Sequence, residues 1–219
     1  MVRLHLLLLI WVFLLNIKNR TLHNINKHVD SILYVCGSNF LYYFLCKDYI
    51  LWDFKSKVVS SKTIRMLHLL FIMPLVLLLY LELFPRQRSD QLMYICKWVV
   101  SSAIVECIGQ KYFKMIYFDN GWNMKWSIWI YMKMYIFSIL FKKKPLVTLF
   151  ASLGVTSFLL IRFKVPLIQN MKEYWMETKR LLRVDKKALI TYLLSFASAV
   201  FCIFSIYFYF RKNKTLRFR

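Results

Sequence analysis

Long apolar runs, separated by short basic stretches, divide this chain into segments. A helix rises 1.5 Å per residue, so about 20 residues cross a hydrocarbon core of roughly 30 Å. The runs are continuous and lack the alternating polarity of barrel strands, which favours helices. The pattern therefore predicts an all-α, polytopic integral membrane helical bundle with about six transmembrane helices, within a range of five to seven. The predicted spans are residues 4–17, 67–84, 91–109, 124–141, 146–161 and 188–210.

Two breaks in the pattern predict antiparallel hairpins. Pro85 ends one run, and a loop of about six residues leads to the next, which predicts a hairpin over residues 67–109. The basic string at 142–145 ends in proline and predicts a second hairpin over 124–161. Residues 31–46 are ambiguous, because an apolar and aromatic run contains Gly-Ser-Asn at its middle. A span, a re-entrant piece and an interfacial helix all stay open there.

The domain organisation follows from the same runs. We expect a single membrane domain over residues 1–219, with a core of four transmembrane helices at 51–161. Residues 162–187 carry eight Lys and Arg side chains between apolar ones, which predicts a basic amphipathic helix on the membrane surface. Residues 188–219 are expected to form a final span with a basic tail.

Composition and charge point to a membrane environment. Hydrophobic residues make up 59% of the chain, and the net charge is +22, whereas soluble proteins are about 45–50% apolar. The basic residues lie mostly between the apolar runs, where they suit anionic headgroups better than nucleic acid. We therefore expect a multi-pass protein of a cell membrane. Its expected partners are membrane lipids with anionic headgroups, other membrane proteins or further copies of itself, with no nucleic acid.

The positive-inside rule leaves the orientation open. If residues 31–46 do not cross the membrane, the count of Lys and Arg residues places the basic loops at 18–66, 110–125 and 162–187 on the cytoplasmic side. The basic tail after residue 210 would then lie on the opposite side, against the rule. If residues 31–46 do cross, only the N-terminus changes sides.

Ionisable residues within the apolar runs are costly, by about 2.5–3.5 kcal/mol at a helix centre. Lys133 lies near the middle of its run, among aromatic residues that can stabilise a cation. Lys97 lies nearer an end and can extend its ammonium group to the interface. Glu82 and Glu106 each lie three residues before a predicted break.

The string from Asp119 to Asn123 is the most distinctive local feature. Asn120 and Gly121 both tolerate positive φ, which predicts a turn, and Asn123 can cap the following helix. Trp122 can anchor that helix at the membrane interface. An antiparallel hairpin would bring the string to the same membrane face as Glu106.

We therefore treat one group as the candidate site: Glu106, Asp119, Asn120, Gly121 and Trp122. In the favoured interpretation, Glu106 locks the hairpin by meeting free N–H groups at the start of the helix after Asn123. In the alternative, the group binds a small polar ligand, with Trp122 as a wall and Lys111 or Lys114 as counter-charge.

Catalytic motifs do not occur in the sequence. It contains no GxSxG, HExxH, GxGxxG or P-loop string, and the four histidines are scattered. No catalytic residue, cofactor or metal site is implied. We expect a non-enzymatic integral membrane protein of the cell envelope, of the assembly or signalling type. A small transporter or channel that uses Glu106 and Lys133 is the alternative, and a membrane-embedded enzyme is the less favoured third.

Residues 51–150 resemble a family of small, uncharacterised membrane proteins of spore-forming Firmicutes. The resemblance is carried by several strings: Leu51-Trp52-Asp53-Phe54, the Ser-Ser-Lys-Thr-Ile-Arg string at 60–65, the Pro74 run ending in Pro85, Glu106, residues Ile116 to Asn123 with their Asn-Gly-Trp motif, the aromatic helix from Trp126 to Tyr135 and the basic-proline break at 142–145. The family has no known activity, so the resemblance implies a membrane fold and no particular chemistry.

Overall fold

The computed structural model describes residues 2–46, 49–56 and 59–166. The predicted final span at 188–219 lies outside the described residues, as does the predicted surface helix at 162–187 beyond its first five residues. The expected core at 51–161 falls within them, except for two residues.

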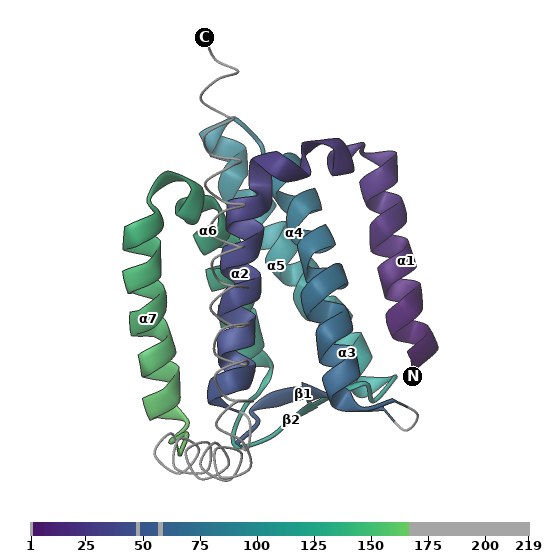
Figure 1. The fold of residues 1–219 in the computed structure, drawn as a ribbon, viewed down its shortest axis with the longest axis vertical. Helices are drawn as coiled ribbons and strands as arrows, with labels where there is room; N and C mark the ends of the chain where they lie inside the picture. The colour runs from purple at the N-terminus through teal and green to yellow at the C-terminus, as the bar shows by residue number, and fades with distance from the viewer. Residues whose placement is uncertain (1, 47–48, 57–58, 167–219) are drawn as a thin grey trace, which may run out of the picture. The chain divides into compact units, whose positions relative to one another are not determined.

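The described chain is mostly helical and runs back and forth along one direction (Figure 1). The helices are α1 (Val2–Lys18), α2 (Ile25–Leu45), α3 (Ser61–Leu67), α4 (Met73–Glu82), α5 (Arg88–Lys111), α6 (Met124–Lys143) and α7 (Pro145–Arg162), with the short segments η1 (Thr21–Asn24) and η2 (His68–Ile72). Short connections join α1 to α2, α4 to α5, and α6 to α7 at the upper end in Figure 1, which we name the turn end. The opposite end carries two short strands, and we name it the strand end.

Three described stretches are long and apolar enough to cross a membrane: Ser61–Glu82, Arg88–Lys111 and Pro145–Arg162. A fourth span results if α1 and α2 count as one span bent by 81°. Helix α6 does not meet this criterion, because its lysines and indoles lower its mean hydropathy. The chain therefore has the apolar helices of a membrane protein, while the number of six remains a prediction.

The ambiguous run at residues 31–46 is helical almost to its end, as part of α2. It continues unbroken through the Gly-Ser-Asn string. Ser38 Oγ donates to the Tyr34 carbonyl at 2.9 Å, and Asn39 Nδ2 donates to the Val35 carbonyl at 3.1 Å. Each polar side chain is therefore satisfied by the preceding turn of its own helix, which keeps the string compatible with a helix.

Helix α4 is the most buried helix, and its aromatic contacts organise the core. Tyr80 is fully buried, and its ring centroid lies 4.5 Å from that of Tyr135 on α6. Tyr94 on α5 donates to the Tyr80 carbonyl at 3.0 Å, and the two rings stack. Helices α4 and α5 therefore meet through aromatic side chains, whereas α5 packs mainly against α6.

Pro74 is accommodated by a local widening of the helix. A proline ring clashes with the carbonyl four residues earlier, and it has no N–H to donate. The π-helical segment η2 at His68–Ile72 immediately precedes α4, where Pro74 occupies the second position. A π turn bonds over five residues, so it relaxes this clash without ending the helix.

A short two-stranded antiparallel sheet is the one departure from helices among the described residues. Strand β1 (Trp52–Phe54) pairs with β2 (Ile116–Phe118), with Asp53 opposite Tyr117. Strands of three residues are too short to show alternating polarity. The sequence pattern therefore predicted neither strand.

Candidate functional site

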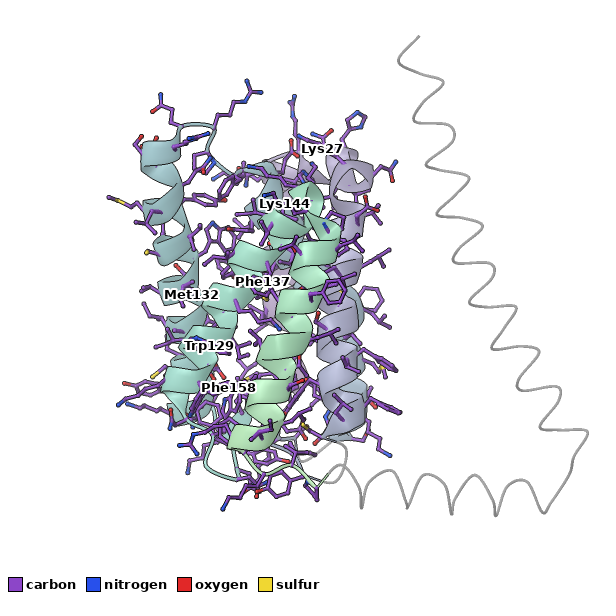
Figure 2. All side chains as sticks on the ribbon, turned by 90° about the vertical axis from the view of Figure 1, so that its left-hand side faces the viewer. Lys27, Trp129, Met132, Phe137, Lys144 and Phe158 are labelled. Carbon is purple, nitrogen blue, oxygen red and sulfur yellow. The ribbon has the colours of Figure 1, made fainter. Side chains whose placement is uncertain are left out.

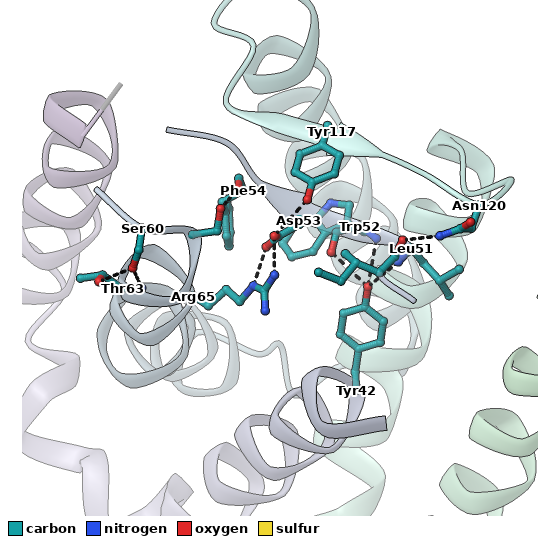
Figure 3. A network of polar contacts seen from close by, with 12 residues as sticks. Tyr42, Leu51, Trp52, Asp53, Phe54, Ser60, Thr63, Arg65, Tyr117 and Asn120 are labelled. Carbon is teal, nitrogen blue, oxygen red and sulfur yellow. Dashed lines mark hydrogen bonds and ion pairs between the residues drawn. The ribbon is translucent and has the colours of Figure 1, made fainter. Parts of the chain in front are cut away.

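The strand end joins elements that are far apart in the chain (Figure 3). The Tyr42 hydroxyl accepts hydrogen bonds from the backbone N–H groups of Leu51 at 3.2 Å and Trp52 at 2.9 Å, and it donates to the Trp52 carbonyl at 3.0 Å. Asn120 Nδ2 donates to the Ile50 carbonyl at 2.8 Å. These bonds satisfy the edge of β1 and fix the sheet to α2.

The predicted turn is confirmed. Asn120 has φ of 49° and Gly121 has φ of 83°. Asp119 Oδ1 accepts from the Asn120 N–H at 2.8 Å, and the Trp122 N–H donates to the Asp119 carbonyl at 2.9 Å. The predicted cap is also confirmed, because Asn123 Oδ1 accepts from the Lys125 N–H at 3.0 Å.

A buried ion pair fixes β1 to α3. Asp53 is only 1% exposed, and its carboxylate accepts from Arg65 Nε at 2.6 Å and from the Arg65 terminal nitrogen. Tyr117 donates to the same carboxylate at 3.2 Å, and the Arg65 guanidinium lies 5.0 Å from the Tyr43 ring centroid. Burial, together with the nearby Asp53 charge, raises the pKa of Tyr117. Sequence reasoning did not connect these residues, although the strings at 51–54 and 60–65 contain both members of the ion pair.

Glu106 lies at the centre of a second network. Its side chain is buried at 2% exposure, and Oε1 accepts from Ser127 Oγ at 3.0 Å and from Trp52 Nε1. Trp122 Nε1 donates to Ser127 Oγ at 3.1 Å. The structure thus brings Glu106 and Trp122 together, with Ser127 as the link that the sequence did not reveal. Oε2 makes no hydrogen bond of standard geometry among the described residues, but the Tyr131 hydroxyl lies close enough to interact with this carboxylate.

The geometry around Glu106 differs from the expectation in two ways. Its donors are side chains, whereas the sequence suggested backbone N–H groups at the start of α6. Asn123 already occupies that helix start. Lys111 and Lys114 are exposed, and no ion pair joins either to Glu106 in the described part of the chain. Of the predicted site, Asp119, Asn120 and Gly121 build the turn and do not reach the carboxylate network.

Histidines tie the start of α1 to the strand end. His5 Nδ1 and His68 Nε2 lie 2.9 Å apart within hydrogen-bonding distance. The Phe54 ring stacks on His68 at 4.0 Å and meets His5 edge-on at 5.4 Å. In the described ranges, no three His, Cys, Asp or Glu residues gather in a way that could hold a metal ion. The histidine pair therefore acts as a packing contact.

At the turn end, the Glu82 carboxylate joins separate elements in the way that Asp53 and Glu106 do at the strand end. It accepts from His28 Nε2 at 2.7 Å, from Asn24 Nδ2 at 2.9 Å and from Lys27 Nζ at 3.4 Å. These bonds join the end of α4 to η1 and the start of α2. The sequence indicated only that Glu82 lies near a helix end, because its partners are more than 50 residues away.

The two intramembrane lysines have different surroundings. Lys97 is exposed on α5. Lys133 is half-buried, and its Nζ lies 5.8 Å from the Phe137 ring centroid, in line with the expected aromatic stabilisation. No ion pair joins Lys133 to Glu106 within the residues that the structure describes. The two residues on which a transport function would depend are therefore not coupled directly.

The polar contacts at the strand end hold separate elements of the chain together. The buried acids Asp53 and Glu106 accept bonds from groups on separate elements, so the segments 51–54, 60–65 and 116–123 meet with Glu106 in one region. This arrangement fixes helices to one another. No family model, curated protein or solved structure matches the chain.

Proposed function

We propose that this chain is a non-enzymatic, multi-pass integral membrane protein of a cell envelope that acts in assembly or signalling. The observation that carries the proposal is the contrast between its inside and its outside. The buried acids Asp53 and Glu106 and the half-buried Glu82 are all bonded within the bundle. The outer faces of two helices, in contrast, are apolar and uncovered by any described element.

Helices α5 and α7 supply these outer faces. On α5, Leu92 and Met93 are 70% and 76% exposed, and on α7, Leu146, Phe150 and Ile161 are 69%, 74% and 78% exposed. Apolar surface of this extent suits contact with lipid chains or with the helices of other membrane proteins. About six membrane crossings, within the range of five to seven, are part of the proposal. The six are α1, α3–α4, α5, α6, α7 and the apolar run at 188–210, and a crossing by α2 would make seven.

Anionic lipid headgroups are the lipid partners that we propose for the strand end. Tyr112 and Phe113 are 79% and 44% exposed in the connection after α5. Exposed lysines flank them, at positions 111 and 114. Aromatic side chains prefer the interface, and each basic residue near an anionic surface contributes about 1 kcal/mol.

Site-specific photo-crosslinking in cell membranes tests the assembly function. A photoreactive residue at Val100 on α5 or at Phe150 on α7 should give discrete higher-mass adducts. The same residue at Leu78 in the core should give only products within the chain, because Leu78 is fully buried. Absence of adducts from both outer positions would contradict an assembly role.

A small transporter or channel is the second candidate, and the burial of the ionisable Glu106 side chain within α5 favours it. The full chain in phosphatidylcholine–phosphatidylglycerol vesicles, with dyes for protons and alkali cations inside, separates the two functions. The assembly function predicts no flux above that of empty vesicles. Flux that Glu106→Gln abolishes would establish the transporter in its place.

A further inference from the structure

Lys133 lies near the middle of α6 and is half-buried. It is nine residues from Met124 and ten from Lys143, which corresponds to about 13 Å and 15 Å along the helix axis. Tyr135 is fully buried in the core, and a separation of two residues turns the side chain by about 200°. The neighbours Met132 and Ile136 are 42% and 39% exposed. Lys133 is half-buried and therefore lies at the edge of the exposed flank of α6 that Met132 and Ile136 form. Figure 2 labels Met132 on this flank.

The charge of Lys133 has little compensation within the described residues. Its described contact is with the Phe137 ring, and none of the ion pairs in that part of the chain involves it. An aromatic face shields a cation on one side only. The ammonium group is also too deep for easy access to headgroups, because both helix ends are more than two turns away.

The chain offers no obvious counter-charge at this depth. Among the predicted apolar runs, the acids are Glu82 and Glu106, and both are bonded elsewhere in the bundle. The last apolar run, 188–210, contains no Asp or Glu. Ionisable side chains within membranes usually pair with one another, so the missing acid is expected on another molecule.

We propose that Lys133 is the docking point for a transmembrane helix of another protein that carries an Asp or Glu at the same depth. The carboxylate would accept charge-assisted hydrogen bonds from Nζ, and the apolar side chains beside Lys133 would pack against the incoming helix. A second copy of the chain fits poorly, since the exposed acids Asp30, Asp90 and Asp119 lie near helix ends or in a loop. The inference rests on the proposed assembly function and names the chemistry of its partner.

The test uses the full-length protein in neutral phosphatidylcholine vesicles, where anionic headgroups do not compete. The probe is a synthetic single-span polyleucine helix with one Glu at its centre, and its twin carries Gln there. Energy transfer between labelled protein and labelled probe reports association. We expect the Glu probe to bind at least tenfold more tightly than the Gln probe. Lys133→Gln should remove this difference, whereas Lys133→Arg should retain it.

Lys97→Gln is the matched control, because Lys97 is also an intramembrane lysine but is exposed on α5. It should leave the preference for the Glu probe unchanged, and the unfolding temperature of Lys133→Gln should stay near that of the native chain. Equal binding of both probes, or an equal loss in Lys97→Gln, would overturn the inference. Self-association without probe that Lys133→Gln removes would also overturn it. Such a failure would leave crosslinking from α5 and α7 unaffected, so it is distinguishable from failure of the assembly function.

Discussion

At the scale of single residues, the two carboxylate oxygens of Glu106 differ in their hydrogen bonding, and this difference predicts how its substitution changes stability. Oε1 accepts bonds from Trp52 and Ser127, whereas Oε2 accepts none of standard geometry among the described residues, and the Tyr131 hydroxyl lies beside the carboxylate. Glu106→Ala leaves the Trp52 indole and the Ser127 hydroxyl without their acceptor, at about 1–3 kcal/mol for each buried group left unsatisfied. Glu106→Gln keeps a carbonyl oxygen and should lose less than half as much. Thermal unfolding in detergent measures both.

Asp30→Ala is the control for that series, because Asp30 is an exposed acid on α2. Its unfolding temperature should match that of the native chain. An unfolding temperature for Glu106→Ala equal to the control would show that the network at Glu106 does not stabilise the bundle. Equal losses for Glu106→Gln and Glu106→Ala would show that Oε1 is not the oxygen that matters.

The Asp53–Arg65 pair predicts strong energetic coupling. Removing either partner leaves a charge in a buried site, which costs about 3–5 kcal/mol for a fully buried pair and toward the lower end here, since Arg65 is 14% exposed. The double substitution to alanine should cost clearly less than the sum of the single ones. Tyr117→Phe removes a neutral donor to Asp53 and should cost about 1 kcal/mol. Denaturant titration of the native chain, the two single alanine variants and the double variant measures the coupling free energy, and Tyr117→Phe is titrated in the same way. If the losses of stability at Asp53 and Arg65 are additive, the coupling is refuted.

At the scale of elements, alanine substitutions at two glycines distinguish the effect of backbone strain on stability from the effect of helix propensity. Gly121 has φ of 83°, and a Cβ there would meet nothing within 4 Å, so Gly121→Ala introduces only backbone strain. We expect a loss of about 1–2 kcal/mol. A Cβ at Gly154 also meets nothing within 4 Å, but Gly154 lies within α7, where alanine is favoured by about 0.5–1 kcal/mol. The unfolding temperature should therefore fall for Gly121→Ala and rise for Gly154→Ala. Shifts of the same sign would contradict the positive φ that the turn requires at Gly121.

At the scale of the whole described bundle, alternating helix directions predict two sets of end positions. Cysteines introduced at Lys62 and Lys114 belong to the strand end, and those at Arg86 and Lys144 belong to the turn end. A membrane-impermeant maleimide should label only one set in intact cells, and the other set only after permeabilisation. The signal is read against that of the native cysteines.

Val100→Cys on α5 serves as the mid-helix control and should stay poorly labelled under both conditions. Labelling of Lys62→Cys together with Arg86→Cys in intact cells would contradict a crossing by α3 and α4. Labelling of Val100→Cys as strong as that of the end positions would contradict burial of α5 in a membrane.

Local features of this protein were determined by the sequence itself. Long apolar runs placed α5, α6 and α7 within a few residues of their observed ends, because helix formation depends on neighbours one turn away. Asn120 and Gly121 form the predicted turn, and Asn123 caps α6, because each effect needs only the residue and its immediate backbone.

Long-range partnerships were decided only by the tertiary structure. Trp52 and Glu106 are 54 positions apart, Asp53 and Tyr117 are 64 apart, and His28 and Glu82 are 54 apart. No periodic pattern encodes such pairs, because each depends on how several helices align side by side. The short strands at 52–54 and 116–118 arise for the same reason, since either one is satisfied only when the bundle brings the other beside it.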